Sequence, residues 1–453
     1  MKNKIDLFET ILNDLVRYEI DDLKIVYVKK EKSIDTITKE SIKNKTIYED
    51  GYSISFNINN QYYFVATDSI SNDKEVKRKI YNLIKKHQLK KKKKKIDRIY
   101  IDFSMFKEKE TPMEYFNLIN YQNDINVFIE KKNEIMDIRI PLLRERKKTY
   151  IITPNSNTIY KEENYYKMDI IMNIEMNGKN RFNYFSMGCS TKIDDVKGIN
   201  VSEKLNELFN VMKKMKSHKQ MNQKCDIVLS NGIGGLLFHE TCGHSLESRE
   251  IIKKSSIMNN VKKIKNKRIT LIDNPKIKNE FGSFQIDDEG NYPKRIELIK
   301  SGKIMNYLCD TKGKKLLDQE ASSCRRESYY HLFSSRMSNT YIEEGKEKFE
   351  DIILSVQDGY FIKNILGGVV DTLSGNFSFN CIEAYKINNG KIDDSICYDN
   401  LTIVGNTMSI LDNTDKIGND LKLASGICGS DSGFIYTTVG QPTIKIKDIM
   451  VVS

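Results

Sequence analysis

The spacing of hydrophobic residues predicts several amphipathic helices in the first half of the chain. At the N-terminus, Ile5, Phe8, Ile11, Leu12 and Leu15 recur at intervals of three and four residues, which places them on one face of a helix. This spacing predicts a helix over residues 4–18, and similar spacing predicts helices over residues 75–86, 112–132 and 202–216.

Shorter apolar runs between these helices predict strands. They are rich in β-branched and aromatic residues and end at turn-forming residues such as those at 59–61, which favour a hairpin. The predicted strands cover residues 23–28, 52–58, 62–66, 148–152, 166–175 and 182–187. Helices and strands therefore mix throughout the first half.

The pattern changes near residue 225. A short apolar strand at 225–229 is followed by a glycine-rich turn and a short helix, and then mostly by strands and loops with frequent glycines. We expect an α+β fold, with a mixed N-terminal domain over residues 1–217 and a β-rich catalytic domain over 218–453 that carries one metal-binding helix.

A run of lysines at 90–95 interrupts the N-terminal half and suggests a linker between two sub-lobes, 1–89 and 96–217. It also contributes to the net charge of +11, from 73 basic and 62 acidic residues. A nucleic-acid contact is the alternative interpretation. No aromatic residues alternate with the lysines to stack on bases, so the linker is favoured.

Composition also bears on location. No stretch approaches the roughly 20 apolar residues of a membrane span. Asp6, Glu9 and Asp14 interrupt the apolar residues at the N-terminus, unlike the core of a signal peptide. None of the eight cysteines forms a CxxC pair. We therefore predict a cytoplasmic protein, without a membrane anchor, whose cysteines are mostly buried thiols.

The candidate chemistry lies in one short segment. Of only five histidines in the chain, two are His239 and His244, and Glu240 follows the first of them. Two imidazoles can bind zinc, and a neighbouring carboxylate can accept a proton from water. The alternative is two ordinary histidines at the end of a helix, but the glycine-rich residues before them and the apolar Leu236–Phe238 favour a helix packed into a core.

The spacing of the two histidines requires a distorted helix. Five residues turn a regular helix by about 500°, which would leave the two rings about 140° apart. A π-type turn, or a bend near Gly243, would bring both rings to one side. A third protein ligand is also needed. Spacing by itself favours Glu247 on the next turn and cannot nominate a distant cysteine, whereas Cys242 is interpreted as a packing residue.

From this segment to the C-terminus the sequence resembles the TldD/PmbA metallopeptidases through a series of motifs in the same order. The motifs are Leu237–Glu247, Gly282–Gly290, Arg325–Leu332, Arg336–Tyr341, Gly367–Asp371, Gly375–Phe379, Glu383–Tyr385, Gly418–Asp420, Gly426–Gly429 and Gly440–Thr443. Since the histidines are present, the chain is similar to the TldD branch and not to the PmbA (TldE) branch, which lacks them. The N-terminal half resembles the family only in outline.

This resemblance implies a zinc peptidase in which His239, His244 and Cys428, from a Gly-x-Cys-Gly motif, hold Zn²⁺ and Glu240 is the catalytic base. It favours Cys428 over Glu247 as the third ligand. It further implies unfolded or leader-containing peptide substrates and a heterodimer with a PmbA/TldE-like partner, with a homodimer as the other possibility. A non-catalytic subunit of such an assembly and a basic nucleic-acid-associated factor are the alternative functions.

Two further residues are candidates for contact with the substrate. His331 could donate a hydrogen bond to a tetrahedral intermediate, although a structural histidine on a strand is favoured. Arg325 could bind a carboxylate, although a structural ion pair is favoured. Asp287, Asp288 and Glu289 are interpreted as a turn that ends at Gly290, in preference to a second metal site.

Overall fold

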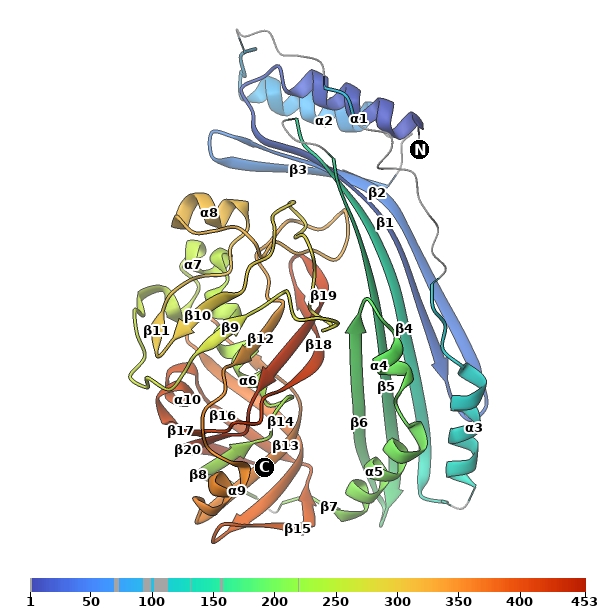
Figure 1. The fold of residues 1–453 in the computed structure, drawn as a ribbon, viewed down its shortest axis with the longest axis vertical. Helices are drawn as coiled ribbons and strands as arrows, with labels where there is room; N and C mark the ends of the chain where they lie inside the picture. Colours follow the sequence, from blue (N-terminus) through green and yellow to red (C-terminus); the bar gives the residue numbers. More distant parts are fainter. Residues whose placement is uncertain are drawn as a thin grey trace.

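The N-terminal half is built on one long antiparallel sheet (Figure 1). The structure is a computed structural model, and it describes residues 2–68, 73–92, 99–101, 113–130, 132–154, 158–218 and 220–453. The strand order is β3 (Gln61–Thr67), β2 (Ile42–Ile58), β1 (Asp21–Ile37), β4 (Ile135–Ile152), β5 (Ile159–Met176) and β6 (Lys179–Ser190). Every neighbouring pair is antiparallel.

Helices α1 (Lys2–Leu15) and α2 (Asp73–Lys86) pack on one end of this sheet (Figure 1). The predicted apolar face of α1 is buried against Tyr27, Tyr52 and Tyr150 from the strands. Helices α3 (Leu118–Ile129) and α5 (Val201–Lys214) cover the other end and share a second core with the sheet. These helices confirm the amphipathic patterns, with shifted ends.

Several predicted bounds were wrong. Strands β1 and β4 contain 17 and 18 residues, far more than the segments predicted at 23–28 and 148–152. The extension of β1 over residues 29–37 is mostly polar, and charged side chains pair across the sheet there, as Asp35 does with Arg144, whereas the extension of β4 also contains buried apolar residues such as Ile138 and Ile140. The helix predicted at 202–216 ends at Lys214, because Met215 and Lys216 form the short strand β7 beside β15.

The sheet contains strands from both sides of the lysine run, because β1 lies between β2 and β4. Residues 93–95 of that run lie outside the described part of the chain, so its role as a linker stays a prediction. The division at residues 217 and 218 also stays a prediction. A hydrophobic core crosses it, where Met212 and Met215 cluster with Val228 and Ile387.

The C-terminal half contains two sheets. One has the order β11 (Lys303–Ile304), β10 (Ile296–Lys300), β9 (Leu271–Asp273), β12 (Asn339–Ile342), β19 (Gly433–Gln441) and β18 (Lys422–Ser430). The other has the order β13 (Asp358–Val370), β8 (Asn222–Leu229), β20 (Ile444–Val452), β16 (Leu401–Asn406), β14 (Asn376–Asn388), β15 (Lys391–Tyr398) and β7, with β17 (Thr414–Ile417) beside β20. Pairing of β13 with β14 joins five of these strands into a closed ring.

Short helical segments accompany these sheets, namely α7 (Ser248–Lys253), α8 (Thr311–Leu317), α9 (Phe349–Leu354), α10 (Thr407–Asn413) and the 3-10 turn Ile257–Asn260, whereas α4 (Asp194–Lys197) packs on β5 and β6 of the N-terminal sheet. The predicted α+β class is therefore confirmed. Within the described ranges, no helix has both the length and the apolar composition that a membrane span requires. The cytoplasmic location stays a prediction.

Candidate metal centre

Both histidines lie on one distorted helical segment. It begins as α6 (Gly235–Phe238), continues as a π-helical turn over His239–Gly243 and ends as a 3-10 turn over His244–Leu246. The His244 N–H donates to the carbonyl of His239, five residues earlier. The two imidazole centroids are consequently only 5.4 Å apart. The predicted π-type turn is therefore confirmed.

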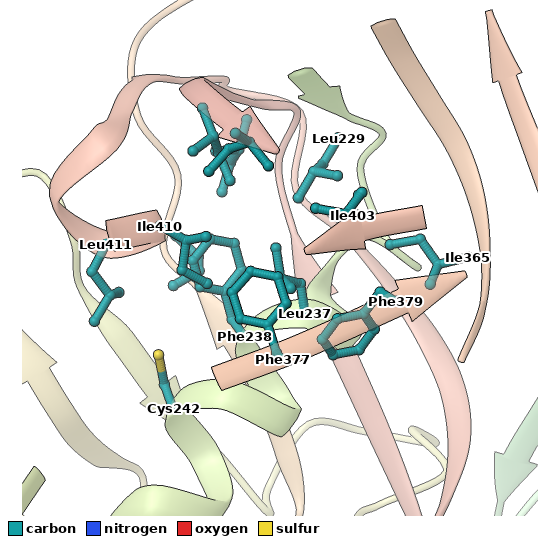
Figure 2. Packing of buried hydrophobic residues seen from close by; sticks show 14 of the residues in the cluster. Leu229, Leu237, Phe238, Cys242, Ile365, Phe377, Phe379, Ile403, Ile410 and Leu411 are labelled. Atoms are coloured by element: carbon teal, nitrogen blue, oxygen red, sulfur yellow. The ribbon is translucent and has the colours of Figure 1, made fainter. Parts of the chain in front are cut away.

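Packing explains why this segment is buried and distorted. Leu237, Phe238 and Cys242 lie in the core of the C-terminal half among Phe377, Phe379 and Ile403 (Figure 2). On the opposite side the segment passes close to its neighbours: a Cβ on Gly243 would lie 2.0 Å from the sulfur of Met337. Cys242 is a packing residue, as expected.

The structure brings His239, His244 and Cys428 together. One ligand atom from each lies within 4.8 Å of the other two, and among the described residues these form the only group of three or more such donors. The Cys428 Sγ atom is 3.2 Å from the Nε2 atom of His244. Donor atoms around a tetrahedral zinc ion lie about 3.5 Å apart, given bond lengths of about 2.1–2.3 Å. The group thus fits a zinc ion.

The charges of these side chains are interdependent. Burial by itself would raise the pKa of Cys428, but His244 and His239 hold it well below the usual thiol value. Burial would lower the pKa of His244, whereas Cys428 and Glu247 raise it well above its usual value. A thiolate beside imidazoles is the form of cysteine that binds metals.

A cavity of about 590 Å³ opens beside this group, and both His239 and Glu240 line it. The Glu240 Oε2 atom is 3.6 Å from the His244 Nε2 atom. The cavity lies between the N-terminal sheet and the C-terminal half, because residues of β5, β6 and α5 form one wall and those of α6, β13 and β18 form the other. A carboxylate and a potential metal site thus share one solvent-accessible space.

Glu247 lies outside the three-donor group. Its Oε1 atom is 3.1 Å from Nδ1 of His244, the ring nitrogen opposite the one near Cys428. Of the two third-ligand candidates, Cys428 is therefore the one next to both histidines.

The remaining candidates lie elsewhere. Neither His331 nor Arg325 is among the residues that line the cavity. Arg325 donates to the carbonyl of Met337 at 2.8 Å, and the Nε2 atom of His331 is 3.9 Å from Glu327. A substrate contact for either stays a prediction.

The acidic turn has a structural role. The Asp287 carboxylate accepts hydrogen bonds from the backbone N–H groups of Glu289 and Asn291, and Gly290 has a positive φ of 95°. Asp288 forms ion pairs with Lys147 and Lys161 of the N-terminal sheet. The turn interpretation explains these residues.

Several cavity residues were missed from the sequence. They come from elements far apart in the chain and carry no local motif: Lys167, Asp169, Tyr184, Phe185, Lys204, Glu207 and Lys363. Glu383 was noted only as part of a motif, yet it lines the cavity and pairs with Lys363 at 2.9 Å. Sequence spacing could not reveal them because only the tertiary fold makes them neighbours.

Comparison with known proteins identifies the family. The sequence profile described as the PmbA/TldA metallopeptidase C-terminal domain matches residues 222–453, just over half of the chain. The chain belongs to the TldD/PmbA family. The matched residues of this TldD/PmbA chain include all four of the proposed metal and base residues, His239, Glu240, His244 and Cys428.

Individual relatives agree with the TldD/PmbA assignment. A protein named metalloprotease TldD homolog, from Buchnera aphidicola subsp. Schizaphis graminum, is 38% identical over 242 residues, 52% of this chain and 50% of that protein. A zinc metalloprotease TldD homolog of Saccharolobus solfataricus is 26% identical over 227 residues, 50% of this chain and 51% of that protein. The aligned region thus spans about half the length of these curated relatives.

The similarity in fold to a solved structure covers the N-terminal half of the chain as well as the half that the family profile matches. The crystal structure of TldE from Thermococcus kodakarensis superposes with a TM-score of 0.70 at 16% identity, covering 99% of this chain and 100% of that one. At this identity the likeness concerns the fold alone. It shows that the N-terminal half, whose sequence resembled the TldD/PmbA family only in outline, shares the family's architecture.

Proposed function

We propose that this chain is a zinc-dependent metallopeptidase of the TldD type. The observation that carries the proposal is the group of His239, His244 and Cys428, which meets a cavity at His239, beside Glu240 in the lining of the same cavity. Two imidazoles and a thiolate suit zinc better than manganese or magnesium, which prefer oxygen ligands. One relative is named a zinc metalloprotease.

These three residues would hold the ion, leaving a coordination position open, as catalytic zinc sites do. When bound, zinc acts as a Lewis acid toward a peptide carbonyl and makes water more nucleophilic. Glu240 is the group that we propose accepts the proton of the attacking water and later returns a proton to the leaving amine. Its carboxylate is partly exposed to the cavity, as a base that meets water must be.

The substrates that we propose are unfolded or leader-containing polypeptides. His239 and Cys428 are 2% and 4% exposed, and His239 lines the cavity under the N-terminal sheet. A folded protein surface is too rigid to enter such a recess, whereas a flexible segment can. Cavity charges form local pairs, such as Lys204 with Glu207 at 2.8 Å, which favours recognition of the peptide backbone over a charged side chain.

We further propose a PmbA/TldE-like partner subunit. The fold shared with TldE supports two related subunits of similar shape. A homodimer of this chain is the alternative, and the measured mass of the purified protein, alone and mixed with such a partner, separates the two.

Metal content tests the site. Elemental analysis of the wild type should give about one zinc per chain, and Cys428→Ala should lose most of it. Cys242→Ala is the matched control, because Cys242 lies between the histidines in sequence but packs into the core; it should retain zinc. Folded wild-type protein without metal would contradict the proposal.

Cleavage tests the base. Glu240→Gln should keep zinc but lower kcat by about 10²–10⁴-fold on an unstructured polypeptide such as casein, the range expected for a general base. The assay is run with and without a TldE-like partner. Zinc-loaded wild type that cleaves nothing in either form would favour the non-catalytic subunit.

A further inference from the structure

We propose that Glu247 and Arg336 form a buried clamp that positions two of the proposed ligands, His244 and Cys428, before metal binds. Both are positioning residues, and neither belongs to the three-donor group. The inference rests on the proposed zinc site and adds to it two residues that contact the ligands and not the metal itself.

Glu247 fixes the orientation and tautomer of His244. Its side chain is fully buried, and its Oε1 atom lies 3.1 Å from the Nδ1 atom of His244. An ionised carboxylate only accepts hydrogen bonds, so it holds a proton on Nδ1. Nε2 is then the ring nitrogen that a metal ion would bind, on the side of Cys428, whose sulfur is 3.2 Å away. Outer carboxylates act in this way on many metal-binding histidines.

Glu247 is itself held firmly. Its backbone ends the helical segment in an extended conformation and forms a β-bridge with Leu308. Its second oxygen, Oε2, accepts from the Nε atom of Arg249 at 2.9 Å. A carboxylate fixed at both its backbone and its far oxygen can impose one orientation on the imidazole.

Arg336 connects this carboxylate to the strand that carries Cys428. The fully buried guanidinium donates from Nη2 to the carbonyl of Cys428 at 2.7 Å. From Nη1 it donates to Ser432 Oγ at 2.6 Å and to the carbonyl of Gly433 at 3.0 Å, in the turn between β18 and β19. Its Nε atom lies 4.0 Å from Oε1 of Glu247.

The two charges depend on each other. A fully buried guanidinium or carboxylate is costly unless an opposite charge and hydrogen bonds compensate it. Arg336 and the nearer Arg249 supply positive charge to the Glu247 carboxylate, whose Oε1 atom also contacts His244. Glu247 supplies negative charge to Arg336, which donates to the carbonyl of Cys428. The pair therefore links the histidine helix to β18, two elements 184 residues apart at their ligands.

His244 and Cys428 are therefore held in their binding positions before the metal arrives. Loss of an outer partner typically weakens metal binding 10–100-fold. We expect Glu247→Gln, which keeps the size but not the charge, to raise the zinc Kd by about that factor. Arg336→Lys keeps the charge but loses the planar fork, so it should also weaken binding.

The experiment measures zinc affinity of the full chain by competition with a chromophoric chelator, together with the absorption spectrum of the cobalt-substituted protein. Asp273→Asn is the control, because Asp273 is an equally buried carboxylate that bonds Ser338 and Thr340 and not the ligands. The control should keep wild-type Kd and spectrum. Glu247→Gln should shift both, which a merely structural role would not do in protein that remains folded.

Arg249→Gln serves if Glu247→Gln does not fold. Arg249 is partly exposed, contacts the far oxygen of Glu247 and also pairs with Glu250 and Asp431, so its loss should be tolerated and should weaken zinc binding several-fold. Wild-type affinity and cobalt spectrum in the folded variants would overturn the clamp. A wild type that binds no zinc would instead overturn the proposed function itself, so the two failures are distinct.

Discussion

At the scale of single residues, the close contact between Gly243 and Met337 keeps the two histidines in position. Gly243 lies in the π turn with φ near that of an ordinary helix, so its requirement is steric and not conformational. A Cβ there would lie 2.0 Å from the Met337 sulfur, far inside van der Waals contact. The glycine therefore lets the distorted turn approach the strand region that packs against it.

Gly243→Ala should lower the free energy of unfolding by about 1–3 kcal/mol, because it overpacks a buried contact. It should also reduce zinc content, since the turn must move to accommodate the methyl group. Urea unfolding and elemental analysis measure the two effects. The double variant Gly243→Ala/Met337→Ala should lose less free energy of unfolding than the two single variants lose together. If the two losses simply add, the proposed contact is contradicted.

At the scale of elements, the polar second half of β1 continues the sheet because its charged residues find partners on neighbouring strands. Arg144 on β4 pairs with Asp35 on β1 at 2.9 Å, and both side chains are less than a tenth exposed. Lys30 on β1 similarly pairs with Glu49 on β2 at 2.6 Å. Cross-strand pairs of this kind let charged sequence continue a buried sheet.

Removing one member of such a pair leaves a buried charge without a partner. Asp35→Ala should therefore lower the free energy of unfolding by about 3–5 kcal/mol. The double variant Asp35→Ala/Arg144→Met should be less destabilised than the sum of the two single variants, by roughly 0.5–3 kcal/mol. A double-mutant cycle in urea measures this coupling, and a value near zero would show that the pair is dispensable.

At the scale of the whole molecule, a buried charge network joins the N-terminal sheet to the C-terminal half. Asp288 lies 2.7 Å from Lys161 and 3.4 Å from Lys147, and it accepts the backbone N–H of Arg326 at 2.7 Å. Burial opposes ionisation of Asp288, but Lys147, Lys161 and Arg326 lower its pKa well below the usual carboxyl value. Burial lowers the pKa of Lys147, whereas Asp288 and Glu163 together raise that of Lys161, which is also the nearer lysine to Asp288.

The sign of the pH dependence follows from this shift. A carboxyl whose pKa is lower in the folded state stabilises the fold above its unfolded pKa, about 4, and that contribution is lost as pH falls below it. Asp288→Asn should thus be less stable than the wild type at neutral pH, and the difference should shrink below about pH 4. Thermal unfolding between pH 3 and 7 measures it; a constant difference would contradict the shift.

Much of this protein was determined by its sequence. The spacing of hydrophobic residues predicted α1, α2 and α5 and the α+β class, because neighbouring residues along the chain are enough to define an amphipathic helix or strand. The i, i+5 histidine spacing predicted a distorted helix, either a π-type turn or a bend near Gly243, since the geometry of a helix fixes where each side chain points; the structure shows the π turn. The motifs that occur in the same order as in the TldD/PmbA family indicated that family from the sequence.

Only the tertiary structure decided the rest. Cys428 could be nominated by resemblance, but its position beside His239 and His244 depends on β18 folding back next to the histidine helix. The length of β1 depends on charges that pair across strands, and a pattern of hydrophobic residues carries no information about such pairs. The cavity walls and the Glu247–Arg336 clamp join residues far apart in the chain, and no local spacing encodes such contacts.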